Sequence, residues 1–248
     1  AETAAPSNPG GEETDDPNDT TVPFDKTQPW DGVSACFDWY VHGDYSHFEI
    51  KDAYDLYGLT LIVSRGNVGG ALYYDANGML ILDTNGDGSV EDEAGYNADR
   101  AVGGDKLADC TVYLTNDIDL NGKIWLPIGY KGSFQGIFDG DGHTVSNWVV
   151  DGSVAYAGTP SAYHYGFFAW NAYDTIQNLT LSNGTINVEA IEGQEWQFIG
   201  AFGGSGDFDC HVRDCNLYDI TVNINNENVI DTYLGYTFTR IRNAASSV

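Results

Sequence analysis

The residues best suited to chemistry are the acidic and amide side chains between positions 83 and 93. Oxygen-bearing side chains stand at alternate positions, at Asp83, Asn85 and Asp87, and Gly88 follows as a residue that permits a sharp turn. Oxygen donors of this kind suit Ca²⁺ better than a transition metal. The spacing therefore predicts a calcium site in this loop, with a solvated acidic turn as the alternative.

The same loop resembles the front half of an EF-hand or dockerin calcium loop. In such loops positions one, three and five supply side-chain oxygens, and position seven supplies its carbonyl. Position twelve is Ala94 rather than an acid, so Glu91 or Glu93 has to complete the shell. The predicted cofactor is Ca²⁺, in a structural role, and the predicted ligands are Asp83, Asn85, Asp87, Ser89, Glu91 and Glu93.

Aromatic side chains offer a second candidate chemistry, the stacking of rings on sugars. The chain has 16 tyrosines and 6 tryptophans, and each ring presents a large, stiff apolar face. Residues 151–165 form the longest loop expected in the repeat region, a natural place for binding. The predicted ligand-binding residues are Tyr156, Tyr163, Tyr165 and Tyr173. The alternative is that these rings only fill corners and cover loops.

Catalysis finds little support in the sequence. The five histidines are scattered, and the sequence has neither a nucleophile elbow nor a phosphate-binding loop. No catalytic residue is therefore assigned. Acidic residues are so plentiful that some pair will lie at a glycosidase separation by chance. A polysaccharide-degrading lyase or hydrolase is the competing hypothesis, by analogy of fold alone.

The charge balance excludes several classes of partner. Against 37 acidic residues stand only 10 basic ones, for a net charge of −27. Contacts to nucleic acid or to anionic lipid need lysine and arginine, so neither is expected. No apolar run approaches the roughly 20 residues of a membrane-spanning helix. The composition fits an exported surface or one that collects cations.

The chain divides into a tail and one large domain. Residues 1–28 are rich in proline and acid and are predicted to form a disordered stalk. Residues 29–248 are predicted to form a single domain, which begins with a strand at residues 36–41. An amphipathic helix follows at about residues 50–64, with Ala53, Tyr57 and Leu61 on one face. Residues 71–107 form an acidic excursion with a β-hairpin around residues 75–78. Cys210 and Cys215 either form a disulfide or remain buried thiols.

Short strands and imperfect repeats fill the rest of the chain. Residues 166–181 are echoed by residues 200–222, with the glycines 34 residues apart and the Asn-Leu pairs 38 apart. This difference predicts an insertion in the second copy, and a weak third copy begins at Tyr233. Repeats of strands without helices between them favour a stack of parallel strands over a sandwich of hairpins.

Three ordered motifs carry a resemblance to GLUG-motif proteins. They are an Asp-Ile-Asp-Leu run at residues 117–120, a Trp-Leu-Pro-Ile-Gly run at 125–129 and a Phe-Asp-Gly-Asp-Gly run at 138–142. Residues 200–203 (GAFG) match the motif that names the family, whereas residues 166–169 (GFFA) lack its last glycine. The resemblance implies a right-handed parallel β-helix whose inward residues are Ile118, Leu120, Phe138, Val145, Phe168, Leu179, Phe202 and Leu217.

The resemblance also implies a secreted or surface-anchored bacterial protein of the adhesin kind. The expected fold is an all-β, short right-handed parallel β-helix with an N-terminal helical cap and a hairpin excursion. The expected function is non-catalytic adhesion or carbohydrate binding at the cell surface, on a chain stabilised by calcium and lipid-anchored to the outer membrane. Expected partners are an extracellular glycan or a surface protein, and a second copy that pairs with the uncapped C-terminal end. A structural spacer of a longer surface protein is a further alternative.

Overall fold

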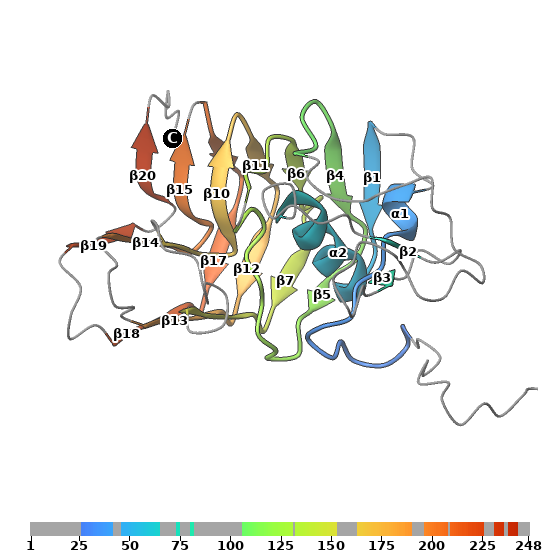
Figure 1. Ribbon diagram of the computed structural model, residues 1–248, viewed down its shortest axis with the longest axis horizontal. Coiled ribbons are helices and arrows are strands. Elements are labelled where there is room, and N and C mark those ends of the chain that lie inside the picture. Colours follow the sequence, from blue (N-terminus) through green and yellow to red (C-terminus); the bar gives the residue numbers. More distant parts are fainter. Residues whose placement is uncertain are drawn as a thin grey trace, which may run out of the picture.

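The structure is a computed structural model that describes residues 26–41, 46–64, 73–74, 80–81, 106–130, 132–152, 163–189, 196–207, 209–225, 231–235 and 238–242. In these ranges most of the regular structure is β-strand, and most strand pairs are parallel (Figure 1). The expected all-β class with parallel strands is therefore confirmed. No helix in the described ranges is long and apolar enough to cross a membrane.

Most strands belong to three successive layers, and the chain forms the five strands of each layer in the same order. The first layer, residues 137–172, contains β6 (Ile137–Asp139), β7 (Thr144–Ser146), β8 (Val149–Asp151), β9 (Tyr163–Tyr165) and β10 (Phe168–Ala172). The middle layer, residues 175–207, contains β11 (Thr175–Gln177), β12 (Thr180–Ser182), β13 (Thr185–Glu189), β14 (Trp196–Gly200) and β15 (Gly203–Asp207). The last layer, residues 211–242, contains β16 (His211–Arg213), β17 (Asn216–Tyr218), β18 (Thr221–Asn225), β19 (Asp231–Gly235) and β20 (Phe238–Arg242). Each strand pairs in parallel with its counterpart in the next layer.

The register between the layers confirms the expected insertion but shortens it. Tyr165 pairs with Ile199 at an offset of 34 residues, whereas Thr175 pairs with His211 at an offset of 36, so the second copy carries two extra residues between these strands. Leu181 pairs with Leu217, so the two Asn-Leu pairs, 38 residues apart, are not equivalent. The expected third copy is confirmed, because Gly200 pairs with Gly235.

Asparagine and aspartate form the corner that follows β7, β12 and β17. Asn147, Asn183 and Asp219 have left-handed φ values of 57°, 48° and 54°, which these residues tolerate better than most. The Asn183 amide donates a hydrogen bond to the Asn147 side chain, whose amide donates to Asp119 at 2.7 Å. These side chains form a polar ladder that joins successive layers at this corner.

A helix closes one end of the stack. β1 (His47–Ile50) pairs with β4 (Thr111–Leu114), which pairs with β6. After β4, a second strand follows within a few residues, namely β5 (Ile118–Asp119), and the later layers repeat this arrangement. After β1, the chain forms the helix α2 (Ala53–Ser64) in place of a second strand. Leu56 and Leu59 of α2 are fully buried in the main core cluster. The expected helical cap is therefore present.

The cap differs from the expected amphipathic helix. Leu56, Leu59 and Ile62 are fully buried, whereas Tyr57 and Leu61 on the predicted inner face are only half-buried. The reason is that the segment before the helix covers its other side. A Cβ atom at Gly58 would lie 2.2 Å from the Cys36 carbonyl oxygen, so this glycine permits the close approach. The strand predicted at residues 36–41 is wrong, since α1 (Asp38–Val41) forms there and Trp39 and Tyr40 pack on Phe48.

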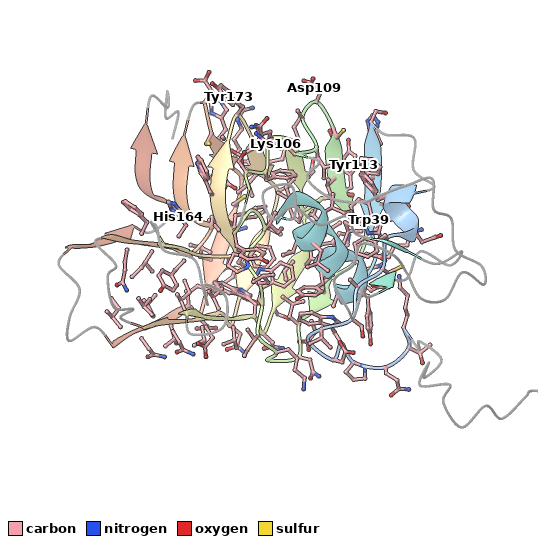
Figure 2. All side chains as sticks on the ribbon, in the orientation of Figure 1. Trp39, Lys106, Asp109, Tyr113, His164 and Tyr173 are labelled. Atoms are coloured by element: carbon pink, nitrogen blue, oxygen red, sulfur yellow. The ribbon has the colours of Figure 1, made fainter. Side chains whose placement is uncertain are left out.

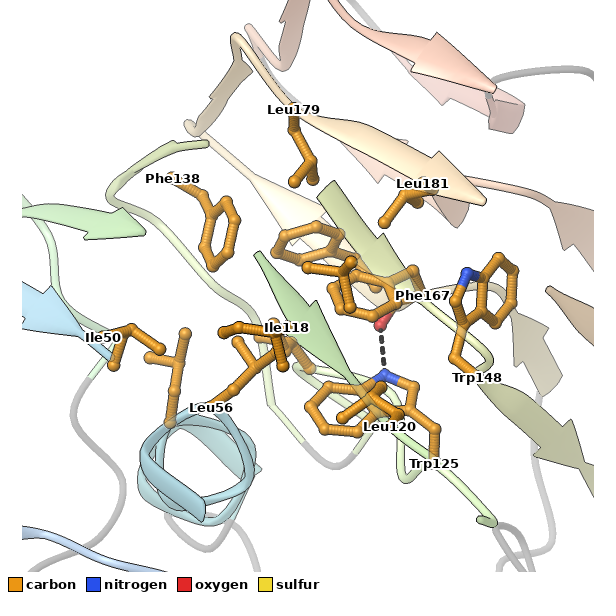
Figure 3. Close-up of a cluster of buried hydrophobic side chains, with 14 of the residues drawn as sticks. Ile50, Leu56, Ile118, Leu120, Trp125, Phe138, Trp148, Phe167, Leu179 and Leu181 are labelled. Atoms are coloured by element: carbon orange, nitrogen blue, oxygen red, sulfur yellow. Dashed lines mark hydrogen bonds between the residues drawn. The ribbon is translucent and has the colours of Figure 1, made fainter. Parts of the chain in front are cut away.

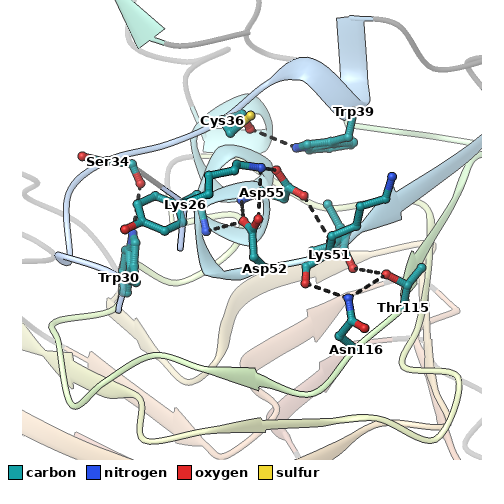
Figure 4. A network of polar contacts seen from close by, with 12 residues as sticks. Lys26, Trp30, Ser34, Cys36, Trp39, Lys51, Asp52, Asp55, Thr115 and Asn116 are labelled. Carbon is teal, nitrogen blue, oxygen red and sulfur yellow. Dashed lines mark hydrogen bonds and ion pairs between the residues drawn. The ribbon is translucent and has the colours of Figure 1, made fainter. Parts of the chain in front are cut away.

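The segment before the helix is anchored by charged side chains (Figure 4). Lys26 forms ion pairs with Asp52 at 3.0 Å and with the buried Asp55 at 2.6 Å. Burial opposes the charge of Lys26, but the hydrogen bond and charge of Asp55 outweigh it and hold the pKa of Lys26 above its usual range. Residues 26–28 therefore belong to the folded part, and the predicted stalk boundary at residue 28 is too late.

Large aromatic residues join the cap to the first layer (Figure 3). Trp125 is fully buried, its ring stacks on Phe167 at 5.0 Å, and its indole N–H donates to the Phe167 carbonyl at 3.0 Å. Trp30 and Tyr57 contact the same indole edge-on. The inward residues expected from the resemblance are buried, except that Leu217 is only half-buried.

Two smaller expectations concern the excursion and the cysteines. β2 (Tyr73–Tyr74) and β3 (Leu80–Ile81) pair antiparallel, which confirms the hairpin. Cys36, Cys110, Cys210 and Cys215 are all thiols, so the two C-terminal cysteines do not form a disulfide.

Candidate functional site

Two aromatic side chains stand out on the surface of the first layer. In β10 the neighbours of Trp170 are buried, whereas Trp170 itself is 39% exposed. Tyr173, at the corner that follows β10, is 58% exposed and has a left-handed φ of 59° (Figure 2). At about 3.3 Å per residue, the two positions are roughly 10 Å apart along the chain. The two exposed residues are therefore close neighbours along the chain.

A stack of rings supports Trp170 from the neighbouring sheet. The His164 ring lies 6.3 Å from the Trp170 ring at an interplanar angle of 21°, and 5.2 Å from the Phe198 ring at 13°. His164 of β9 and Phe198 of β14 are also paired in register. Because the indole is held by this stack, its orientation is fixed before a ligand arrives. We call Trp170, Tyr173 and His164 the aromatic platform.

The platform suits the stacking of apolar faces. Trp170 and Tyr173 combine exposed ring area with a backbone held inside a parallel sheet and its corner. Rigid aromatic rings contribute contact area with little loss of side-chain entropy. The arrangement is chemically suited to a planar or alternately polar and apolar ligand, of which a sugar ring is the common example.

The four predicted tyrosines fall in different places. Tyr173 is exposed as expected, and Tyr163 lies in β9 in register with Gln197. Tyr165 is fully buried, which corrects its assignment as a ligand-binding residue. Its ring packs against Gly152, where a Cβ atom would lie 2.6 Å from it. Tyr156 lies outside the described residues.

The predicted calcium ligands also lie outside the described residues. This holds for Asp83, Asn85, Asp87, Ser89, Glu91 and Glu93. In the part of the chain that the structure describes, no group of three or more histidine, cysteine or acidic side chains is arranged to hold a metal. The calcium loop therefore stays a prediction from sequence.

A buried carboxyl group lies directly behind the platform. Asp174 follows Tyr173, is 2% exposed, and has the Cys210 thiol as its hydrogen-bonding neighbour. Thr175 pairs with His211, so the preceding residues, Asp174 and Cys210, occupy equivalent positions in adjacent layers. The side-chain amide of Asn171 is also fully buried and has no hydrogen-bond partner. A carboxyl group and a thiol are thus buried together at this corner.

Burial changes the acidity of this carboxyl group. Loss of water raises the pKa of Asp174 from 3.8 to about 7, against a smaller opposing interaction with the Cys210 thiol. A pKa near 7 is typical of a general acid or base. At 2% exposure, however, the carboxyl is closed to a polymeric substrate, so we interpret it as a structural group that titrates near neutral pH.

The described thiols are poor nucleophiles. Burial raises the pKa of Cys36 and of Cys215 to about 11. Burial and the neighbouring Asp174 carboxylate raise the pKa of Cys210 above its usual range. Because the thiolate is the reactive form, none of these three cysteines is poised for catalysis at neutral pH.

Comparison with protein-family models, with curated proteins and with solved structures gave no match to this chain.

Three residues of this region, Trp170, His164 and Asp174, were not predicted from the sequence. The one local signal was Trp170 itself, a large aromatic residue at the end of the apolar run 167–170 and next to the polar Asn171. His164 and Asp174 gave none. The neighbour of His164 lies in β14, and that of Asp174 lies in the segment before β16. Local sequence patterns do not predict contacts between residues so far apart in the chain.

Proposed function

We propose that the stack of layers is a short right-handed parallel β-helix with a helical cap. The support is that five strands recur in the same order in each layer, at an offset of 34 to 36 residues between the middle layer and its neighbours for most strands. The ordered GLUG-like motifs favour the same architecture. Right-handed winding is the common sense for crossovers between parallel strands.

We infer that the chain is a non-catalytic binding protein for carbohydrate at a bacterial cell surface. The observation that carries this inference is the exposure of Trp170 and Tyr173 on one edge of the first layer, with His164 stacked behind the indole. Extracellular location and a lipid anchor are part of the proposal. They are favoured by the acidic composition, by the proline-rich segment before residue 26, and by the GLUG-like motifs.

The alternative, a polysaccharide-degrading enzyme, is less well supported. The group with a pKa near 7, Asp174, is enclosed, and the thiols are held protonated. The exposed acids Asp117 and Asp119 accept hydrogen bonds at corners of the chain. Binding through rings needs none of these groups, so it is the simpler use of the observed surface.

Replacing Tyr173 or Trp170 with alanine should weaken binding to a glycan by about tenfold to a hundredfold, because an aromatic anchor in an interface contributes about 2 kcal/mol or more. A glycan array with the full chain identifies the ligand, and calorimetry with that glycan measures the dissociation constant of each variant.

Tyr218→Ala is the matched control for Tyr173→Ala. Tyr218 is also 58% exposed but lies on β17, in a different sheet, so its loss should leave affinity unchanged. Equal loss of affinity in Tyr173→Ala and Tyr218→Ala would contradict the platform. Turnover of the bound glycan would overturn the non-catalytic assignment.

The calcium loop is part of the same proposal and has its own test. Calorimetric titration of the full chain with Ca²⁺ should give binding heat, and Asp87→Ala should remove most of it, since Asp87 is the predicted fifth-position ligand. Asp92→Ala, at the tenth position of the loop, should bind as the unaltered chain does. Absence of binding heat in the unaltered chain would end the idea.

A further inference from the structure

The last layer of the stack exposes side chains that are buried one layer earlier. Ile176, Leu181, Ile186 and Val188 of the middle layer are fully buried. Their register partners in the last layer are Val212, Leu217, Val222 and Ile224. The first three of these partners are half-buried, and Ile224 is 42% exposed. The inner face of the last layer is therefore an apolar surface, which we call the end face.

Strand edges accompany this apolar surface. Among the described strands, β16, β17 and β18 each lie at the edge of their sheet and pair on one side only. The opposite end of the molecule carries α1, α2 and β1, whose core residues are buried (Figure 1). Within the described residues, this end alone thus offers both unpaired strand edges and exposed inner residues, and such edges pair readily with another strand.

The charge of the last layer sets it apart from the layers before it. Residues 137–172 and 175–207 contain no lysine or arginine, whereas residues 211–242 contain Arg213, Arg240 and Arg242. Their four acids, Asp214, Asp219, Glu227 and Asp231, leave the last layer with a net charge of −1, in a chain whose net charge is −27. Two copies can therefore approach through this layer without the repulsion that the rest of the surface imposes.

We propose that the end face is the interface with a second copy of this chain, packed end to end about a two-fold axis. Like strand edges related by a two-fold axis run antiparallel and can exchange hydrogen bonds. The exposed Arg213 of one copy then faces the exposed Asp214 and Asp219 of the other. Since the opposite end is closed by the helical cap, assembly stops at two copies and forms no filament.

This proposal is independent of the aromatic platform, and it is tested by measuring the molecular mass of the protein in solution. Sedimentation velocity of the full chain from about 1 µM to about 200 µM, a range that brackets micromolar dissociation constants, should show a monomer converting into a dimer. Ile224→Glu should remain a monomer, because it places two carboxylates in the paired apolar faces. Arg213→Glu alters an exposed side chain. It should raise the dissociation constant of the dimer at least tenfold and leave the far-ultraviolet circular dichroism unchanged.

Ile137→Glu provides the matched control. Ile137 is 38% exposed, close to the 42% of Ile224, but lies in β6 on the side of the stack. This variant should dimerise as the unaltered chain does. A chain that is monomeric at every concentration, equal weakening by Ile137→Glu and Ile224→Glu, or species that grow beyond a dimer would each overturn the proposal.

Discussion

Asp174→Asn should raise the free energy of unfolding at pH 8 by up to roughly 4 kcal/mol and leave it nearly unchanged at pH 4. The carboxyl group is 2% exposed, and its hydrogen-bonding neighbour is the Cys210 thiol, which is only a weak donor. Burial raises its pKa from 3.8 to about 7 in the folded chain. Each tenfold change in proton affinity corresponds to about 1.4 kcal/mol, which gives the expected size.

The sign follows from proton linkage. Between pH 3.8 and about pH 7 the folded chain keeps the Asp174 proton, whereas the unfolded chain releases it. The stabilisation is therefore complete below pH 3.8 and is lost as the pH rises through about 7. Asparagine has no proton to lose, so the difference between variant and parent should grow across this window. Urea unfolding at a series of pH values measures it.

Asp209→Asn is the control for this experiment. Asp209 is exposed at the corner equivalent to that of Tyr173 in the preceding layer. This variant therefore gives the effect of the same substitution at an exposed corner, with which Asp174→Asn is compared at each pH. If the two variants give the same difference from the parent at every pH, Asp174 is ionised and solvated in the folded chain, and our interpretation of the corner is wrong.

Trp125→Ala should lower the free energy of unfolding by about 3–5 kcal/mol, the usual cost of deleting a large buried aromatic ring. The indole is fully buried between the cap and the first layer, where it contacts Trp30, Tyr57 and Phe167. Its removal leaves a cavity and also leaves the Phe167 carbonyl without the indole N–H donor. Denaturant unfolding followed by circular dichroism measures the loss.

Two variants separate the causes of this loss. Trp125→Phe keeps an aromatic ring but removes the N–H. It should cost about 1–3 kcal/mol for the lost hydrogen bond together with the smaller ring, while the Phe167 carbonyl still accepts from the Ile128 N–H. Trp170→Ala removes an indole that is 39% exposed and should cost clearly less than Trp125→Ala. A similar loss in the two alanine variants would contradict the assignment of Trp125 to the core and Trp170 to the binding surface.

Local sequence patterns predicted the elements well where a strand or helix depends mainly on its own residues. The parallel stack, the hairpin at residues 73–81 and the helix ending at Ser64 were all expected from periodicity and turn residues. The strand predicted at residues 36–41 does not form. The apolar side chains of Cys36, Phe37 and Trp39 instead pack on α2 and Phe48. Tertiary contact overrode a pattern of only six residues.

The candidate site was less predictable than the fold. Tyrosine content pointed to the region around β9 and β10, but it did not separate the buried Tyr165 from the exposed Tyr173. Adjacent strand residues point to opposite faces, so a shift of one position decides between core and surface. The register that fixes this position is set by β14 in the next layer, which lies more than thirty residues away along the chain.

The sequence alone determined the class of the protein: an acidic chain of short strands, recurring glycines and Asn or Asp corners, without the basic surface that nucleic acid requires. These properties are local or compositional, so they do not depend on which residues become neighbours in the folded chain. Only the tertiary structure decided the 36-residue register, the enclosure of Asp174, the stacking of His164 on Trp170 and the exposed end face. Burial and ring contact depend on neighbours brought in from other layers, so no single stretch of the chain encodes them.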